Sequence, residues 1–179
     1  MEQKYSWIAC FKAFSVLFSI KGVFLISGVV LKQLKQIRDD RGYLMEMLRS
    51  DWPEFSKQGK FGQCYMTVCN AGVAKAWHFH KKQVDRFIVA KGMARIALYD
   101  ARKKSKTRGE LNEFVIGEDN PALLVIPKGV IHGFTSATNN PAYIVNIPTQ
   151  LYDYSKPDEY RMPFDTIEIP YDWKCERGG

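Results

Sequence analysis

The chain has 179 residues, 46% of them hydrophobic and 25% charged, a balance typical of one folded globular domain with a sizeable core. Its formal net charge is +7, yet it has no dense Lys/Arg run with interleaved aromatic residues and no helix-turn-helix motif. Nucleic acid is therefore excluded as the expected partner. The remaining explanations for the charge are a phosphate-bearing ligand, an anionic membrane or a solvated surface.

The N-terminal region is apolar from Tyr5 to Leu31, but Lys12 and Lys21 divide it. No charge-free run reaches the roughly 18–20 residues that a membrane-spanning helix needs, so we expect no membrane span. We interpret residues 1–20 as an extension outside the core and residues 21–179 as a single domain. A weak membrane anchor in the extension is the alternative.

The four cysteines form neither a C-x2-C pair nor a plausible disulfide framework; they are Cys10, Cys64, Cys69 and Cys175. Free thiols are typical of a reducing compartment, so the sequence predicts a cytoplasmic protein.

Short β-branched and aromatic runs, separated by turn residues, follow the extension. A helical turn is expected near Trp52 and Pro53, and the polar, proline-punctuated segment from Tyr152 onward is expected to fold over the mouth of a barrel. The predicted strands are 23–26, 29–31, 43–48, 61–69, 75–80, 86–90, 94–99, 112–116, 122–126, a strand at Phe134, and 143–147. Strands at this spacing, with no long helical periodicity, predict an all-β sandwich or jelly roll.

All three histidines fall in two short pieces of the chain. The first runs from Gly72 to Gly92 and contains His78, His80 and Asp85, and the second runs from Pro127 to His132. Alternate residues of a strand share a face, so His78 and His80 point the same way and His132 can converge on them from a facing strand. The spacing matches the cupin signature G-x5-H-x-H-x4-E-x6-G and P-x-G-x2-H, with Asp85 in place of Glu. We therefore predict a cupin jelly-roll β-barrel.

The same residues suit a metal ion. His78, His80, Asp85 and His132 offer three imidazoles and one carboxylate, a set that binds Fe, Mn, Ni or Zn. A metal-dependent cupin, either an isomerase or an oxygenase, is therefore one reading of the sequence. A non-catalytic sugar-binding cupin is another.

From about Gly22 to Trp173 the chain also resembles the dTDP-4-dehydrorhamnose 3,5-epimerases. Asp100 to Gly109 is similar to their D-x-R-x2-S-x-T-x-G, and Ile126 to Phe134 is similar to I-P-x-G-x2-H-G-F. These two pieces are the most specific, because generic cupins need neither. The resemblance implies a homodimeric epimerase that needs no cofactor, acts on a nucleotide-diphospho-4-keto-6-deoxysugar and serves polysaccharide precursor synthesis.

The resemblance also implies roles for individual residues. His78 would be the catalytic base and Asp165 its carboxylate partner, while Lys75 stands where the family has Arg and would stabilise the enolate oxygen. The substrate-binding candidates are Arg41, Glu46, Gln63, His80, Arg102, His132, Asn146 and Tyr152. Salt bridges that stabilise turns are the alternative role for Arg41 and Arg102, and a loop carboxylate or helix cap is the alternative for Asp165.

Besides Lys75, several positions depart from the family pattern. The tyrosine that acts as general acid falls at Asn146, the family H-Y-Q is His78-Phe79-His80, and its lysine before the hairpin is Asp85. An amide cannot deliver a proton. Two possibilities remain open. One is inversion at one carbon, with the proton returned by water or by another residue such as Tyr143 or Tyr152, and the other is ketoisomerisation through the same enolate.

Overall fold

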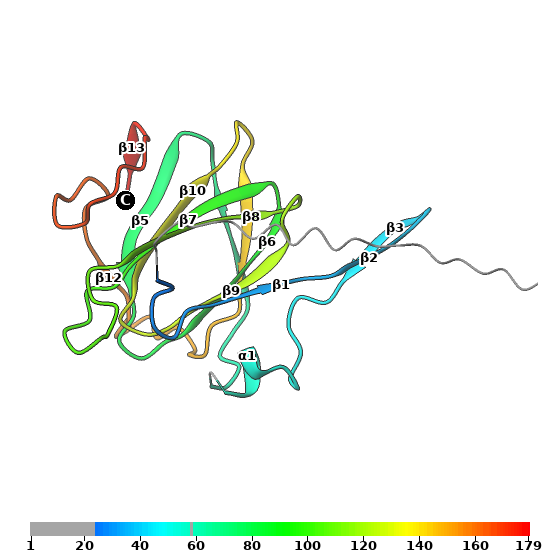
Figure 1. Cartoon of the computed structure of the whole chain (residues 1–179), viewed down its shortest axis with the longest axis horizontal. Coiled ribbons are helices and arrows are strands. Elements are labelled where there is room, and N and C mark those ends of the chain that lie inside the picture. The colour runs from blue at the N-terminus through cyan, green and yellow to red at the C-terminus, as the bar shows by residue number, and fades with distance from the viewer. Residues whose placement is uncertain (1–23, 58) are drawn as a thin grey trace, which may run out of the picture.

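The computed structural model describes residues 24–57 and 59–179, and two β-sheets make up most of it (Figure 1). The predicted extension, residues 1–20, lies outside the described residues. The first sheet has five strands in the order β1 (Val30–Gln33), β9 (Ala122–Ile126), β6 (Asp85–Lys91), β11 (Ala142–Asn146) and β4 (Tyr65–Cys69). All of its neighbouring strands are antiparallel.

The second sheet runs in the order β12 (Tyr160–Arg161), β5 (Val73–Phe79), β10 (Ile131–Ser136), β7 (Met93–Tyr99) and β8 (Leu111–Gly117), and β13 (Arg177–Gly178) also pairs with β5. The two sheets form a jelly roll, so the predicted all-β cupin class is confirmed. The predicted strands between residues 75 and 147 match β5 to β11 within a few residues, whereas β12 and β13 were not predicted. The run Phe24–Ile26 is not a strand, because the Ile26 amide donates instead to Asn112 Oδ1 at 2.8 Å.

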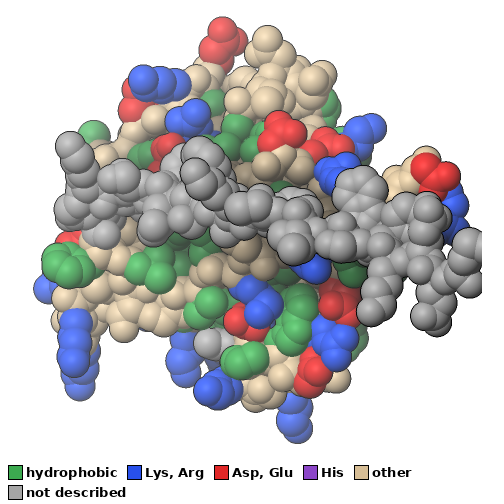
Figure 2. All heavy atoms as spheres, turned by 45° about the vertical axis from the view of Figure 1, so that its right-hand side comes forward, with side chains coloured by type: hydrophobic (Ala, Val, Ile, Leu, Met, Phe, Trp, Pro, Cys, Tyr) green, Lys and Arg blue, Asp and Glu red, His purple; other side chains and the backbone are tan. Residues whose placement is uncertain are grey.

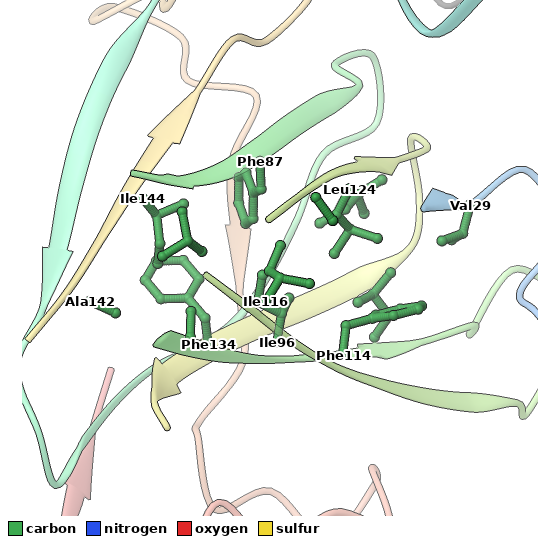
Figure 3. Packing of buried hydrophobic residues seen from close by; sticks show 14 of the residues in the cluster. Val29, Phe87, Ile96, Phe114, Ile116, Leu124, Phe134, Ala142 and Ile144 are labelled. Atoms are coloured by element: carbon green, nitrogen blue, oxygen red, sulfur yellow. The ribbon is translucent and has the colours of Figure 1, made fainter. Parts of the chain in front are cut away.

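The main core lies between the two sheets, where side chains of β6, β7, β8, β9, β10 and β11 interdigitate (Figure 3). Alternation along β6 explains this core: Phe87 and Val89 enter it, while Ile88 packs on the outer face of the sheet with Leu123 and Val125. Because both faces of β6 and β9 are covered, these strands read as almost continuous apolar runs.

Two smaller elements lie outside the sheets. The hairpin of β2 (Gln36–Asp39) and β3 (Gly42–Met45) projects away from the jelly roll in Figure 1. It is followed by α1 (Pro53–Ser56), a single turn with proline at its first position, as predicted. Among the described residues no helix has the length and apolar character to cross a membrane.

The C-terminal segment covers the outer face and one end of the second sheet. Ile169 and Trp173 are buried there against Trp77, and β12 adds a short strand to the edge of β5. The predicted tail over the mouth of the jelly roll is therefore confirmed. On the face drawn in Figure 2, lysine and arginine side chains are interspersed with acidic ones instead of forming one continuous basic patch.

Candidate functional site

His78 and His132 form a cross-strand pair in the second sheet. They are direct partners in the antiparallel pairing of β5 with β10, and their ring centroids are 4.1 Å apart. Gly133 permits this pairing, because a Cβ at position 133 would lie 2.3 Å from the Cβ of Ala76. The close approach of β10 and β5 thus requires the glycine of the H-G-F sequence.

His80 and Asp85 complete the cluster from either side. His80 follows the end of β5, and Asp85 begins β6 in the opposite sheet. Oδ2 of Asp85 lies 3.3 Å from Nε2 of His80 and 3.3 Å from Nε2 of His132. The two strips of sequence that contain the histidines therefore do converge, as the alternation along β5 predicted.

Hydrogen bonds fix the tautomers of two of the imidazoles. His132 Nδ1 donates to the Val130 carbonyl at 3.0 Å, and His80 Nδ1 donates to the Asp158 carbonyl. A carbonyl can only accept, so Nδ1 carries the hydrogen in both rings. When neutral, each ring then presents the Nε2 lone pair to the Asp85 carboxylate. His132 is 1% exposed, and its Nε2 has no hydrogen-bond donor or acceptor among the described residues.

Asp85 is held ionised by its neighbours. Burial alone would raise its pKa, but the contact with His132, the positive charge that His132 and His80 carry when protonated, and a hydrogen bond from Asn146 outweigh burial and lower the pKa. Oδ1 accepts from Gln83 Nε2 at 2.7 Å and from Asn146 Nδ2 at 2.8 Å. Hydrogen bonds from Gln83 and Asn146 therefore fix the orientation of the Asp85 carboxylate.

His78 is a neutral imidazole at working pH. Burial lowers its pKa well below the ordinary 6.5, and the neighbouring His132 lowers the pKa further, although Asp85 acts in the opposite direction. A neutral ring with an available lone pair is the form that a general base requires.

Two of the three imidazoles border a pocket of about 760 Å³, a size suited to a small molecule. His78 and His80 line it directly, together with Lys75, Gln63 and Tyr152, which are also predicted site residues. Lys75 Nζ donates to Thr67 Oγ1 at 2.9 Å, and Gln63 Oε1 accepts from the Tyr152 amide at 3.4 Å. Tyr152 belongs to the C-terminal segment, which closes this side of the pocket.

Four predicted site residues lie elsewhere in this chain. Asp165 is exposed in the turn after Pro163 and does not line the pocket with His78. The nearby carboxylate whose charge acts on His78 is instead Asp85. Arg102 is held by the side chain of Asp100 and the Ser27 carbonyl, each at 2.8 Å. Arg41 and Glu46 are exposed in or after the projecting hairpin, where they pair with Asp39 and Arg49.

Asn146 lies behind the pocket instead of facing it. It is 1% exposed, and its Nδ2 donates to Tyr65 Oη at 2.9 Å as well as to Asp85. Tyr65 lines the pocket, and sequence reasoning missed it. Only the register that pairs Asn146 with Tyr65 across β11 and β4 could have pointed to it, and register is not readable from strand propensity alone.

The donor set also fits a metal ion. His78, His80 and His132 each offer a ring nitrogen, and these nitrogens lie within 4.8 Å of one another. Two ligands of one ion with bonds of about 2.1 Å are roughly 3–3.5 Å apart, which is close to the separations from Asp85 Oδ2 to the two Nε2 atoms. The buried Nε2 of His132, which no hydrogen bond occupies, supports this fit.

Comparison with known proteins places the chain in a family. The model of the dTDP-4-dehydrorhamnose 3,5-epimerase family matches residues 24–177. The chain is 42% identical to a probable low-salt glycan biosynthesis epimerase of Haloferax volcanii, over 86% of this chain and 98% of that protein. It is 41% identical to the spore coat polysaccharide biosynthesis protein SpsL of Bacillus subtilis, over 85% and 99% of the two chains.

A solved structure agrees with these sequence relatives. The crystal structure of a dTDP sugar isomerase from Desulfovibrio desulfuricans G20 superposes with a TM-score of 0.77 at 33% identity, covering 84% of this chain and 95% of the other. The chain therefore belongs to the dTDP-4-dehydrorhamnose 3,5-epimerase family and is a carbohydrate epimerase of the isomerase class.

Proposed function

We propose that the protein inverts a carbon next to the C4 ketone of a nucleotide-diphospho-4-keto-6-deoxysugar, with His78 as the base. The ketone acidifies the protons on the neighbouring carbons. His78 removes one of them, the C–H electron pair moves to the carbonyl oxygen, and the ammonium of Lys75 stabilises the resulting enolate. The observation that carries this proposal is that the His78 imidazole and the Lys75 side chain line the same pocket.

The relatives support a role in glycan precursor synthesis. Two of them are named for glycan and spore coat polysaccharide biosynthesis. We infer that this chain supplies an activated sugar to a comparable pathway and works in the cytoplasm. The free thiols of Cys64, Cys69 and Cys175 are consistent with that compartment.

The test is solvent exchange. In D₂O, wild-type protein given dTDP-4-dehydrorhamnose is expected to incorporate deuterium next to the ketone, as followed by ¹H NMR. The His78→Asn variant is expected to lose exchange by at least about 100-fold, the usual contribution of a general base. The control is Lys81→Met, an exposed residue outside the pocket lining. A wild type that is stabilised by the nucleotide but exchanges nothing would instead be a binding module.

We further propose a homodimer in which the projecting hairpin completes the partner's pocket. Ile37 and Leu44 on the hairpin are 57% and 60% exposed, too much apolar surface for a free tip. Arg41, whose guanidinium suits a diphosphate, and Glu46 lie in this region and do not line the pocket of their own chain.

Mixing two inactive variants tests the shared pocket. Arg41→Ala lacks the diphosphate contact and His78→Asn lacks the base, so each homodimer is expected to be weak. A mixed dimer regains one intact pocket, and up to about a quarter of wild-type activity is expected after the two proteins are unfolded and refolded together. No recovery in a mixture that light scattering shows to be dimeric would contradict the exchange of hairpins.

A second candidate function is a metal-dependent reaction at the same imidazoles. It is favoured by the convergence of two Nε2 lone pairs on Asp85. Elemental analysis of protein purified without a histidine tag distinguishes the base mechanism from the metal-dependent reaction. The base mechanism expects no stoichiometric transition metal and full exchange after chelation, whereas one ion per chain, lost together with activity on chelation, would establish the metal reading.

A further inference from the structure

Inversion of a carbon requires a proton donor on the face opposite the base. The residue at the position of the family's tyrosine, Asn146, is an amide buried behind the pocket. It has no acidic hydrogen, and both ends of its side chain are already engaged. The proton must therefore come from another side chain of the pocket or from water.

Tyr65 lies one strand away from Asn146 and faces the pocket. The two residues are direct partners in the pairing of β11 with β4, and Tyr65 Oη lies 2.9 Å from Asn146 Nδ2. Tyr65 comes from the five-stranded sheet, whereas His78 comes from the six-stranded sheet, and both line the same pocket. A ligand between the sheets therefore meets the two side chains from different walls.

The hydrogen bonds of Asn146 determine the direction of the phenol proton. Asn146 Oδ1 accepts from the Arg86 amide at 3.0 Å, and Nδ2 donates to the Asp85 carboxylate, so the orientation of the amide is fixed. Tyr65 Oη must then accept from Nδ2. Among the described residues Tyr65 Oη has no other hydrogen-bond partner, which leaves its own hydrogen available to a ligand.

The phenol also remains protonated at working pH. Partial burial raises the pKa of Tyr65 to about 12, and the negative charge of Asp85 contributes in the same direction. Tyr65 is 42% exposed, so solvent can return the proton after each turnover.

We propose that Tyr65 is the catalytic residue that protonates the enolate, a role that rests on the proposed function of His78. The C–H bond breaks as His78 takes the proton, and the electron pair passes to the C4 oxygen. The electron pair then returns to the carbon, which forms a new C–H bond on the opposite face with the Tyr65 hydrogen. Water reprotonates the phenolate and takes the proton from His78, so no oxidant or cofactor is consumed.

The experiment measures exchange and inversion separately for Tyr65→Phe. With dTDP-4-dehydrorhamnose in D₂O, the variant is expected to keep exchange within about threefold, because His78 still removes and returns the proton on its own face. Formation of the inverted epimer, followed by NMR, is expected to fall at least about 100-fold. Tyr160→Phe is the matched control, because Tyr160 is 38% exposed but does not line the pocket, and it is expected to invert normally. Tyr152→Phe is measured beside it as the competing candidate for the proton donor.

Each outcome decides between the roles. Normal inversion by a folded Tyr65→Phe protein overturns the assignment to Tyr65. Loss of exchange and inversion together, at an unchanged melting temperature, also overturns it, because the phenol would then be acting on the enolate oxygen. A wild type that exchanges no deuterium contradicts the proposed function itself, and a Tyr152→Phe variant that alone loses inversion transfers the role to Tyr152.

Discussion

Asp85 and His132 come from opposite sheets, yet Oδ2 of one lies 3.3 Å from Nε2 of the other. The His132 Nδ1 hydrogen is already donated to Val130, so only a proton or a cation at Nε2 makes this contact favourable. The Asp85 carboxylate therefore favours a proton or a metal cation at Nε2 of His132. Five measurable consequences follow from this cluster and from the framework around it.

Replacing Asp85 by Asn removes the charge and keeps the shape. We expect kcat/KM for exchange to fall about 100-fold, as is common when a group that orients catalytic imidazoles is lost. The melting temperature should change little, because an amide can donate to the same nitrogens. Gln83→Leu is the comparison, since it removes one hydrogen bond to Asp85 but no charge, and its loss should be below about tenfold. Equal activity of Asp85→Asn and wild type would exclude this role.

Lys75→Met tests stabilisation of the enolate. The ammonium is needed where negative charge develops, so kcat should fall by about 100- to 1,000-fold while KM changes by less than about threefold. Steady-state kinetics on dTDP-4-dehydrorhamnose provide the measurement. Thr67→Val, which removes only the hydroxyl that Lys75 contacts at 2.9 Å, should have a much smaller effect. An increase in KM alone would assign Lys75 to ground-state binding.

Asp100 and Asp39 offer a matched pair of D-x-R sequences in two environments. Asp100 is buried and accepts from Arg102, Ser105 and Thr107, whereas Asp39 pairs with Arg41 on an exposed hairpin. We expect Asp100→Asn to lower the free energy of unfolding by about 2–4 kcal/mol, measured by urea denaturation. Asp39→Asn should leave the midpoint unchanged. Equal effects would mean that burial does not distinguish the two pairs.

The same substitution has a defined pH dependence. Burial alone would raise the pKa of Asp100, but hydrogen bonds from Arg102, Ser105 and Thr107 outweigh it, so the pKa lies below the ordinary 3.8. A lowered pKa in the folded state stabilises the protein above about pH 4, and this stabilisation is lost as the pH falls toward the folded-state value. The stability difference between wild type and Asp100→Asn should therefore be constant from pH 5 to 8 and shrink below pH 4.

Gly133→Ala tests the close approach of β10 and β5. The new Cβ would lie 2.3 Å from Ala76 Cβ and 2.9 Å from a ring carbon of Trp173, so the strands must separate. Overpacking of this kind costs about 1–3 kcal/mol, which thermal unfolding can detect. The double variant Ala76→Gly with Gly133→Ala removes the worst contact and should recover part of the loss. No recovery would assign the cost to Trp173.

Local pattern was sufficient to predict much of the jelly roll. Alternation along the Lys75–His80 strand placed His78 and His80 on one face, and turn residues separated most strands correctly. The same reasoning failed at Phe24–Ile26, where a side chain of β8 satisfies the backbone instead of a neighbouring strand. Resemblance alone placed Arg102 near substrate, although its hydrogen bonds to Asp100 and Ser27 hold it in a loop.

By itself, the sequence determined the strand pattern, the two histidine pieces and the family, because each depends on spacing along one segment of the chain. Only the tertiary structure decided how distant groups meet: that one oxygen of Asp85 contacts both His80 and His132, that Asp165 does not line the pocket with His78, and that Tyr65 stands beside Asn146. The physical reason is that these contacts depend on how two sheets face each other and on the register between strands, which the residues of a single strand do not encode.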